Sequence, residues 1–285
     1  MFRSLNPGAL GIKCSLEETI TYAIRYGFEG FDVPIGEVLR RSDSSGIETV
    51  AALLNNSGLL LGPCGLSIDW RTEDEAIFQQ GLTELPRFAS IAQRLGVTRV
   101  TTWVLPGHNE RTKQEQWHFL LKRFRRIATI LGDHGLRLGL EFIGPKTSRD
   151  RFRHEFIYTA PEMLIFAREV GSNVGLLHDS WHWYTSGGTL AEIRGMANRD
   201  IVAVHVNDAP AGIPRDEQID NVRLLPMESG VIDLPGYLTA LKSIRYDGPV
   251  TVEPFSARLR TLPPEEAIAQ TADALDKAWK AASFK

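Results

Sequence analysis

The chain has 285 residues, of which 43% are hydrophobic and 24% are charged, and its formal net charge is -3. This composition is typical of a globular protein with a large core and argues against collagen-like, low-complexity and disordered chains. A slightly acidic balance gives no general attraction to nucleic acid or to an anionic membrane, since both favour a strongly basic face. We therefore expect a small-molecule partner, with no nucleic acid and no membrane.

The chain begins Met-Phe-Arg-Ser-Leu-Asn-Pro-Gly, without the long apolar stretch of a signal peptide, and no run approaches the roughly 18 apolar residues of a membrane span. We expect a cytoplasmic protein. The two cysteines, Cys14 and Cys64, are far apart and outside any C-x-x-C motif, which argues against a disulfide framework and a structural zinc knuckle. We interpret both as packing residues.

Short apolar or β-branched runs alternate along the chain with longer segments of helical periodicity. The runs predict eight strands, at residues 9–13, 30–33, 59–66, 99–104, 138–142, 174–177, 201–206 and 250–253. The segments between and after them predict eight helices, at residues 16–26, 35–56, 73–95, 113–134, 161–170, 190–197, 234–244 and 264–282. This alternation predicts a parallel sheet closed on itself, a single (β/α)₈ TIM barrel over residues 1–285.

A doubly wound open sheet is the rival architecture. No Gly-x-Gly-x-x-Gly motif follows an early strand and no Walker-type loop is present, so the barrel is favoured. Residues 207–233, after the seventh predicted strand, are long for a loop between a strand and its helix. Loops at that face of a barrel usually form the site.

Polar residues stand at the ends of the last four predicted strands, where a barrel forms its catalytic face. They are Glu141, Asp179, His205 and Glu253. Adjacent strands lie about 4.8 Å apart, so inward side chains from successive strand ends can converge. Each residue alone is more often a solvated loop residue, a helix cap or a core histidine, but charged groups are rarely buried unpaired. Together they favour one divalent ion, Mn²⁺, Mg²⁺, Co²⁺ or Zn²⁺.

At these residues the chain resembles the xylose-isomerase-like barrels, which include ketose 3-epimerases and inosose isomerases or dehydratases. The resemblance covers nearly the whole chain and is most specific in Asp-x-x-His followed by a histidine on the next strand. The resemblance rests on six segments: Gly27-Phe28-Glu29-Gly30-Phe31-Asp32, Leu140-Glu141-Phe142, Asp179-Ser180-Trp181-His182-Trp183, His205-Val206-Asn207-Asp208, Arg223-Leu224-Leu225-Pro226 and Val252-Glu253-Pro254.

The resemblance implies a metal-dependent isomerase or epimerase of a keto-sugar or related polyol. Its metal ligands would be Glu141, Asp179, His205 and Glu253. Glu141 and Glu253 would also be the acid/base pair, and His182 and Arg223 would hold substrate oxygens. A metal bound to a carbonyl and the neighbouring hydroxyl stabilises an enediolate, and two carboxylates on opposite faces can remove and return a proton.

Other candidates rest on position. Trp183, beside His182, could form an apolar wall under a sugar ring or could equally be barrel packing. Trp103 and His108, near the end of the fourth predicted strand, are expected at the pocket. Four basic residues of the 146–154 loop could receive a substrate phosphate or carboxylate, although a solvated basic loop is the commoner case: Lys146, Arg149, Arg151 and Arg153.

The chain departs from its relatives at two motifs. Many relatives carry Pro-Gly-x-Gly where this chain has Pro226-Met227-Glu228-Ser229, and many carry Glu where this chain has the shorter Asp32. The loop before Arg223 is also longer than in ketose 3-epimerases, which leaves Arg215 as a substitute for Arg223. Substrate choice therefore stays open.

Three other functions compete with an isomerase. A lyase or dehydratase could use the same metal and carboxylates to expel a β-substituent, as in dehydration of an inosose or cleavage of a 3-keto-glycoside. The sequence does not separate these outcomes from isomerisation. A nuclease of the same superfamily would need about three metals and further histidines, in regions where this chain has Cys64 and Trp103. A non-catalytic binding barrel would not need the intact ligand set. The oligomeric state is open, with a homo-oligomer among the expectations.

Overall fold

The computed structural model describes residues 1–284, and its main sheet is all parallel, in the order β3-β2-β1-β11-β10-β9-β7-β5-β4. The two ends of this order, β3 and β4, are consecutive pieces of one segment, so the sheet closes into the predicted barrel. The strands are β1 (Phe2–Leu5), β2 (Gly30–Phe31), β3 (Leu60–Leu61), β4 (Cys64–Gly65), β5 (Arg99–Val104), β7 (Arg137–Phe142), β9 (Val174–Asp179), β10 (Ile201–Val206) and β11 (Pro249–Val252).

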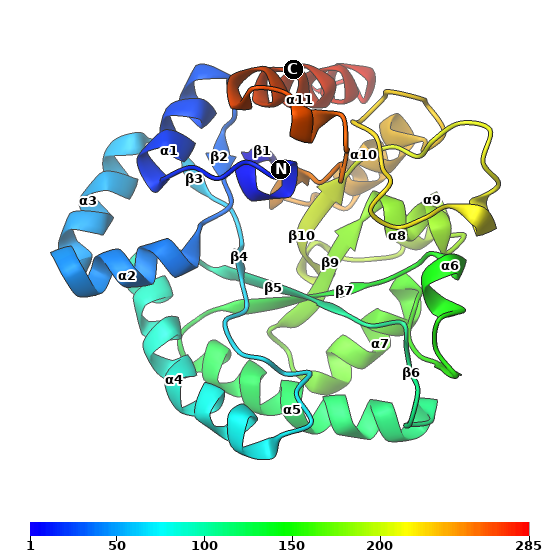
Figure 1. The fold of residues 1–285 in the computed structure, drawn as a ribbon, viewed down its shortest axis with the longest axis horizontal. Helices are drawn as coiled ribbons and strands as arrows, with labels where there is room; N and C mark the ends of the chain where they lie inside the picture. The colour runs from blue at the N-terminus through cyan, green and yellow to red at the C-terminus, as the bar shows by residue number, and fades with distance from the viewer. Residues whose placement is uncertain (285) are drawn as a thin grey trace.

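Helices surround the strands in chain order (Figure 1). Their buried apolar faces pack on the barrel, and Ser15, Thr112 and Thr189 start three of them with capping boxes. The outer helices are α1 (Leu16–Arg25), α2 (Ile35–Ser45), α3 (Ile47–Ser57), α4 (Glu75–Arg94), α5 (Lys113–Asp133), α7 (Ala160–Val170), α9 (Leu190–Arg194), α10 (Leu234–Ser243) and α11 (Pro264–Ala281). Among residues 1–284, no helix is both long and apolar enough to cross a membrane.

The third barrel strand is interrupted at Gly62 and Pro63. The β3 piece pairs with β2, and the β4 piece pairs with β5. Between the pieces, the Gly62 N–H donates to the Phe31 carbonyl at 2.8 Å and the Val33 N–H donates to the Pro63 carbonyl at 2.9 Å. A Cβ at position 62 would lie 2.6 Å from both the Asp32 Oδ1 and the Ser4 Oγ, so only glycine fits there.

The first barrel strand is Phe2–Leu5, and the prediction of a strand at residues 9–13 is wrong. Asn6 accepts a hydrogen bond from the Ala9 N–H and starts a short 3₁₀ helix, Pro7–Leu10, which Gly11 ends at a φ of 79°. Proline and a left-handed glycine are incompatible with a strand over this segment. The strand was missed because the Phe2–Leu5 run is short and places the polar Ser4 in the barrel interior.

The predicted helix at 35–56 is two helices, α2 and α3. Gly46 separates them with a φ of 81° and a ψ of 146°, values outside the helical range. The prediction also lacked two short helices, α6 (Lys146–Arg149) and α8 (Ser180–Thr185), and the antiparallel pair β6 (Gly107–His108) and β8 (His154–Glu155). These additions follow strands β5, β7 and β9, at the face where the candidate site lies.

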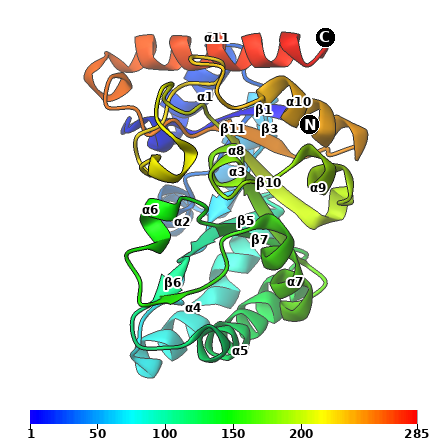
Figure 2. The same ribbon diagram turned by 90° about the vertical axis from the view of Figure 1, so that its right-hand side faces the viewer.

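The long loop at 207–233 is anchored against α6, and Figure 2 shows both on the same side of the barrel as β6. The Asp208 carboxylate accepts hydrogen bonds from three backbone N–H groups at the far end of the loop, at residues 229, 230 and 232. Gln218 donates to the carbonyls of Pro210 and Ile213, and the Thr147 hydroxyl of α6 donates to the Gln218 carbonyl at 2.7 Å. The loop is therefore held in one conformation over the barrel mouth.

Candidate metal centre

The register of the last four strands brings four candidate ligands to one face. His205 on β10 pairs with Asp179 at the end of β9, and Glu141 on β7 pairs with Leu177, two residues before Asp179. Because side chains alternate along a strand, these three point to the same side of the sheet. Glu253 follows β11 directly, and its N–H donates to the Val206 carbonyl at 3.1 Å.

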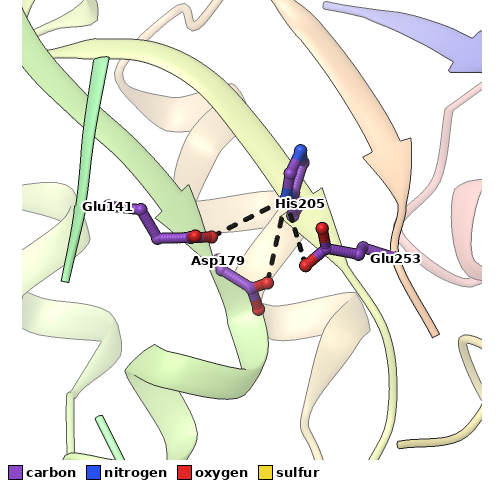
Figure 3. Close-up of side chains that lie close together, drawn as sticks. All are labelled: Glu141, Asp179, His205 and Glu253. Atoms are coloured by element: carbon purple, nitrogen blue, oxygen red, sulfur yellow. Dashed lines mark ion pairs between the residues drawn. The ribbon is translucent and has the colours of Figure 1, made fainter. Parts of the chain in front are cut away.

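One ligand atom from each of Glu141, Asp179, His205 and Glu253 lies within 4.8 Å of the other three. Figure 3 shows the three carboxylates directed at the imidazole. The His205 Nδ1 is 3.5 Å from the Glu253 Oε2, 3.7 Å from the Glu141 Oε1 and 3.9 Å from the Asp179 Oδ2. These separations leave room for an ion among the four atoms.

Two of these ligand atoms lack a hydrogen-bond partner. Within residues 1–284, the Glu141 Oε1 and the His205 Nδ1 are buried and accept or donate no hydrogen bond. Buried polar atoms almost always have a hydrogen-bond partner, so two neighbouring buried atoms without one indicate a position for a bound group between them. Three carboxylates and one imidazole are ligands that suit Mn²⁺, Mg²⁺, Co²⁺ or Zn²⁺. The residues present therefore fit one divalent cation.

The charges of this group shift the pKa values of its members in opposite directions. Burial, and next the charge of Glu253, raise the pKa of Glu141 well above its usual range. Burial acts against ionisation of Glu253 too, but His205 and Arg223 outweigh it and lower the pKa of Glu253 to about 2. Burial likewise disfavours the charged imidazole, yet the carboxylates, Glu253 foremost, raise the pKa of His205 to about 10. The cluster thus attracts positive charge.

Two cavities meet at this cluster. The first, of about 440 Å³, is lined by Glu141 and Glu253 together with Trp103, His182 and Arg223. The second, of about 490 Å³, lies toward β1 to β4 and reaches His205 on the other side. The ligand group therefore stands between two spaces that open at the barrel mouth.

His182 and Arg223, predicted to hold substrate oxygens, are both buried in the wall of the first cavity. The Gly144 N–H donates to the His182 Nδ1 at 3.2 Å, which orients the imidazole. Burial and then the Arg223 charge lower the pKa of His182, so the imidazole is neutral. Arg215, the substitute candidate, is exposed in a short 3₁₀ helix, Arg215–Glu217, so the structure places Arg223 at the site instead.

The two predicted tryptophans have different positions. Trp103 pairs in register with Glu141, lines the first cavity and is 39% exposed. Trp183 is buried in α8, where its ring packs 5.2 Å from the Tyr237 ring, and it does not line either cavity. The helical turn of α8 directs His182 toward the site and Trp183 away from it.

Of the four basic residues of the 146–154 loop, only Arg151 lines the first cavity. Arg149 pairs with Glu155 and Lys146 pairs with Asp150, so these two cations already have partners. His108 lies outside the first cavity, where its Nδ1 accepts hydrogen bonds from the N–H groups of residues 110 and 111.

Two acids near the site were missed or undervalued by the sequence analysis. Asp220, in the long loop, lines the first cavity and contacts Arg223. Asp32 lines the second cavity and accepts hydrogen bonds from the Ser4 and Thr251 hydroxyls at 2.6 and 2.9 Å. The Asp220-x-x-Arg223 spacing was a usable signal, because residues three apart can meet when the chain turns between them.

Comparison with known proteins agrees with the fold and the resemblance. Residues 20–278 match the family described as the xylose isomerase-like TIM barrel. An inosose isomerase from Bacillus subtilis (strain 168) is 28% identical over 209 residues, which cover 71% of this chain and 70% of that protein. These matches confirm the predicted family and the predicted class of enzyme, an isomerase or epimerase.

Two solved structures share the whole architecture. A xylose isomerase domain protein from Alicyclobacillus acidocaldarius superposes with a TM-score of 0.88 at 28% identity, over 100% of both chains. The IOLI protein, solved with a bound zinc atom, superposes with a TM-score of 0.81 at 21% identity, again over 100% of both chains. The predicted TIM barrel is thereby confirmed.

Proposed function

Because the chain belongs to the xylose isomerase-like TIM-barrel family, we propose that it is a divalent-metal-dependent isomerase or epimerase of a keto-sugar or cyclitol. The observation that carries this proposal is the largely buried group of three carboxylates and one imidazole between two cavities. The similarity to an inosose isomerase makes an inosose the first substrate to test. We also propose that the whole chain acts as one barrel domain.

In the proposed reaction, Glu141, Asp179, His205 and Glu253 would hold the ion. When bound, a divalent cation polarises a carbonyl oxygen and acidifies the neighbouring C–H group. The first cavity, at about 440 Å³, is within the size range of small-molecule sites. Its wall offers the hydrogen-bond groups of His182 and Arg223 to the substrate oxygens.

The proton transfer itself is assigned to Glu253 and Glu141. Glu253, whose pKa is lowered to about 2 mainly by His205 and Arg223 against the effect of burial, is ionised and can accept the proton from the carbon next to the carbonyl. The electron pair of that C–H bond then forms the C=C bond, and the carbonyl π pair moves to the carbonyl oxygen, which gives the enediolate. Glu141, on the opposite side of His205 from Glu253 in Figure 3, returns a proton to carbon. Opposed pKa shifts in a carboxylate pair are typical of acid/base partners.

The first test is elemental analysis of divalent metals on protein purified without chelator, alongside Glu141→Ala and His205→Ala. We expect about one ion per chain, lost in both variants, since each removes a ligand. Glu155→Ala, which removes an exposed glutamate of β8, is the matched control and should keep its metal. Metal-loaded protein is then incubated with an inosose in D₂O, and exchange of the proton next to the carbonyl is followed by NMR.

Incorporation of deuterium by the wild type, but not by Glu141→Ala, would support the proposal. Failure of the wild type to bind any of the four metals would overturn the metal site. Metal binding without proton exchange on inososes or ketohexoses would support the metal site but refute the proposed isomerase activity. Loss of water from the substrate would point to the dehydratase.

A further inference from the structure

Arg223 is buried among acids on two sides. Its Nη1 donates to the Asp179 Oδ2 at 2.9 Å and to the Glu253 Oε2 at 3.0 Å. Its Nη2 and Nε both donate to the Asp220 Oδ1, at 2.7 and 3.3 Å. Only 1% of the side chain is exposed, so these acids, and not water, balance its charge.

Aromatic rings restrict where the guanidinium can go. Its Cζ lies 4.6 Å from the centre of the Phe255 ring and 5.5 Å from that of Trp181. Such contacts favour the cation over the ring faces. Its Nη2 also lies 3.2 Å from the His182 Nε2. The rings and this imidazole leave the guanidinium between Asp220 on one side and the two ligand carboxylates on the other.

The oxygens that Arg223 contacts are the ones that face the candidate metal position. The Asp179 Oδ2 and the Glu253 Oε2 are also the carboxylate atoms that lie within 4 Å of the His205 Nδ1. An oxygen that accepts a guanidinium hydrogen bond is less available to a second cation, and two positive charges nearby repel. Arg223 and a divalent ion thus compete for Asp179 and Glu253.

We propose that Asp220 is a positioning residue that sets the metal affinity of the site through Arg223. Its carboxylate holds two of the guanidinium nitrogens on the side of the long loop, so that Arg223 keeps a partner when an ion takes the two ligand oxygens from its Nη1. The inference rests on the proposed metal site and extends it, since Asp220 lies outside the ligand set. Asp220 also lies on the cavity wall, so the same contact presents Arg223 to the substrate.

A double-mutant cycle tests this with metal affinity as the readout and no sugar present. Mn²⁺ is titrated calorimetrically into metal-free wild type, Asp220→Ala, Arg223→Met and the double variant. Removing the competitor in Arg223→Met should tighten Mn²⁺ binding about tenfold, and removing its counter-ion in Asp220→Ala should weaken it about tenfold. The double variant should match Arg223→Met, because Asp220 acts through the arginine.

The sign of each change separates this role from a structural one. A loop-folding role for Asp220, or a direct effect of its charge on the ion, would weaken binding equally in both backgrounds and would overturn the inference. So would weaker Mn²⁺ binding by Arg223→Met. Asp216→Ala removes an exposed acid of the same loop and should leave the affinity unchanged.

Thermal unfolding of the metal-free proteins checks that each variant is folded. If Arg223→Met does not fold, the cycle is repeated with Arg223→Gln, which also removes the charge, and the same outcomes apply. A wild type that binds no Mn²⁺, Mg²⁺, Co²⁺ or Zn²⁺ overturns both this inference and the proposed metal site. A wild type that binds metal, with an additive cycle, overturns this inference alone.

Discussion

The two halves of the barrel wall differ in regularity. Strands β7, β9 and β10 have six residues each and pair over four or more positions with a neighbour, and each delivers one candidate ligand. Strands β2, β3 and β4 have two residues each, and the segment that contains β3 and β4 is interrupted. Asp32, on the irregular side, accepts hydrogen bonds from two hydroxyls, whereas the acids on the regular side point at the His205 imidazole.

This difference indicates that the two halves of the barrel have different roles. Long strands with fixed register place successive strand ends at predictable spacings, which suits ion coordination. Short strands with turns between them leave space instead, and the second cavity of about 490 Å³ lies on that side. We therefore expect changes on the regular side to affect chemistry and changes on the irregular side to affect stability or fit.

The largest effect is expected from Glu253→Gln on the regular side. The change removes a ligand charge and the proposed base while keeping the volume of the side chain. Turnover should fall by at least about 1,000-fold, with the circular dichroism spectrum unchanged. Steady-state kinetics on metal-loaded protein measure it, and near-normal activity would contradict the assignment of Glu253.

Asp32→Ala should instead cost stability without loss of metal. It leaves the Ser4 and Thr251 hydroxyls without their acceptor in the barrel interior, which should lower the free energy of unfolding by about 2 kcal/mol. Urea denaturation gives the value, with Asp43→Ala as a control because Asp43 is exposed and pairs with Arg87 on the surface. Metal loss in Asp32→Ala would show that the two halves are not separate in function.

Trp103 stands on β5, which pairs with both halves, with β4 on one side and β7 on the other. Because Trp103 lines the first cavity and is partly exposed, Trp103→Ala should raise KM about tenfold and leave the melting temperature nearly unchanged. Trp183→Ala, in the packed core of α8, should show the reverse pattern. Equal KM effects in both variants would place Trp183 at the substrate after all.

The smallest effect concerns a thiol on the irregular side. Burial, followed by the charge of Asp32, raises the pKa of Cys64 to about 12. The thiolate is the reactive form, so only about one Cys64 in 10,000 is reactive at pH 8, and alkylation should speed up about tenfold per pH unit up to pH 10. Peptide mapping after iodoacetamide treatment measures the rate. A rate that levels off below pH 9 would contradict this burial.

The regular half could be predicted from sequence in detail and the irregular half only in part, for physical reasons. The predicted strands at 30–33 and 59–66 contain β2, β3 and β4, but the interruption at Gly62 and Pro63 was not predicted. Glu141, Asp179 and Glu253 end or follow apolar runs and His205 is the second-last residue of one, and strand alternation fixes the direction of their side chains. The Phe2–Leu5 strand is short and has a polar interior residue, so the sequence pattern favours a strand in the apolar run at 9–13 instead. Strand pairing cannot be read from a two-residue strand.

The rest of the site depends on irregular backbone. Arg223 was found through a family motif, but its contact with Asp220 depends on how the 207–233 loop folds, which is set by the carboxylate of Asp208 and the amide of Gln218. The burial of Trp183 follows from the turn of α8, which has six residues and too little periodicity to detect. Gly46 was visible, but a glycine inside a helical pattern does not always end it.

The interruption at Gly62 and Pro63 also leaves a weakly paired segment in the barrel wall. Each of the two-residue pieces on either side is held to a single neighbour, and proline contributes no amide proton to the wall. Each piece makes fewer strand-to-strand pairs than the six-residue strands do, so among the barrel strands hydrogen exchange should be fastest in β3 and β4 and slowest in β9 and β10. We therefore expect the wall beside the second cavity to open to solvent more readily than the strands that carry the ligands.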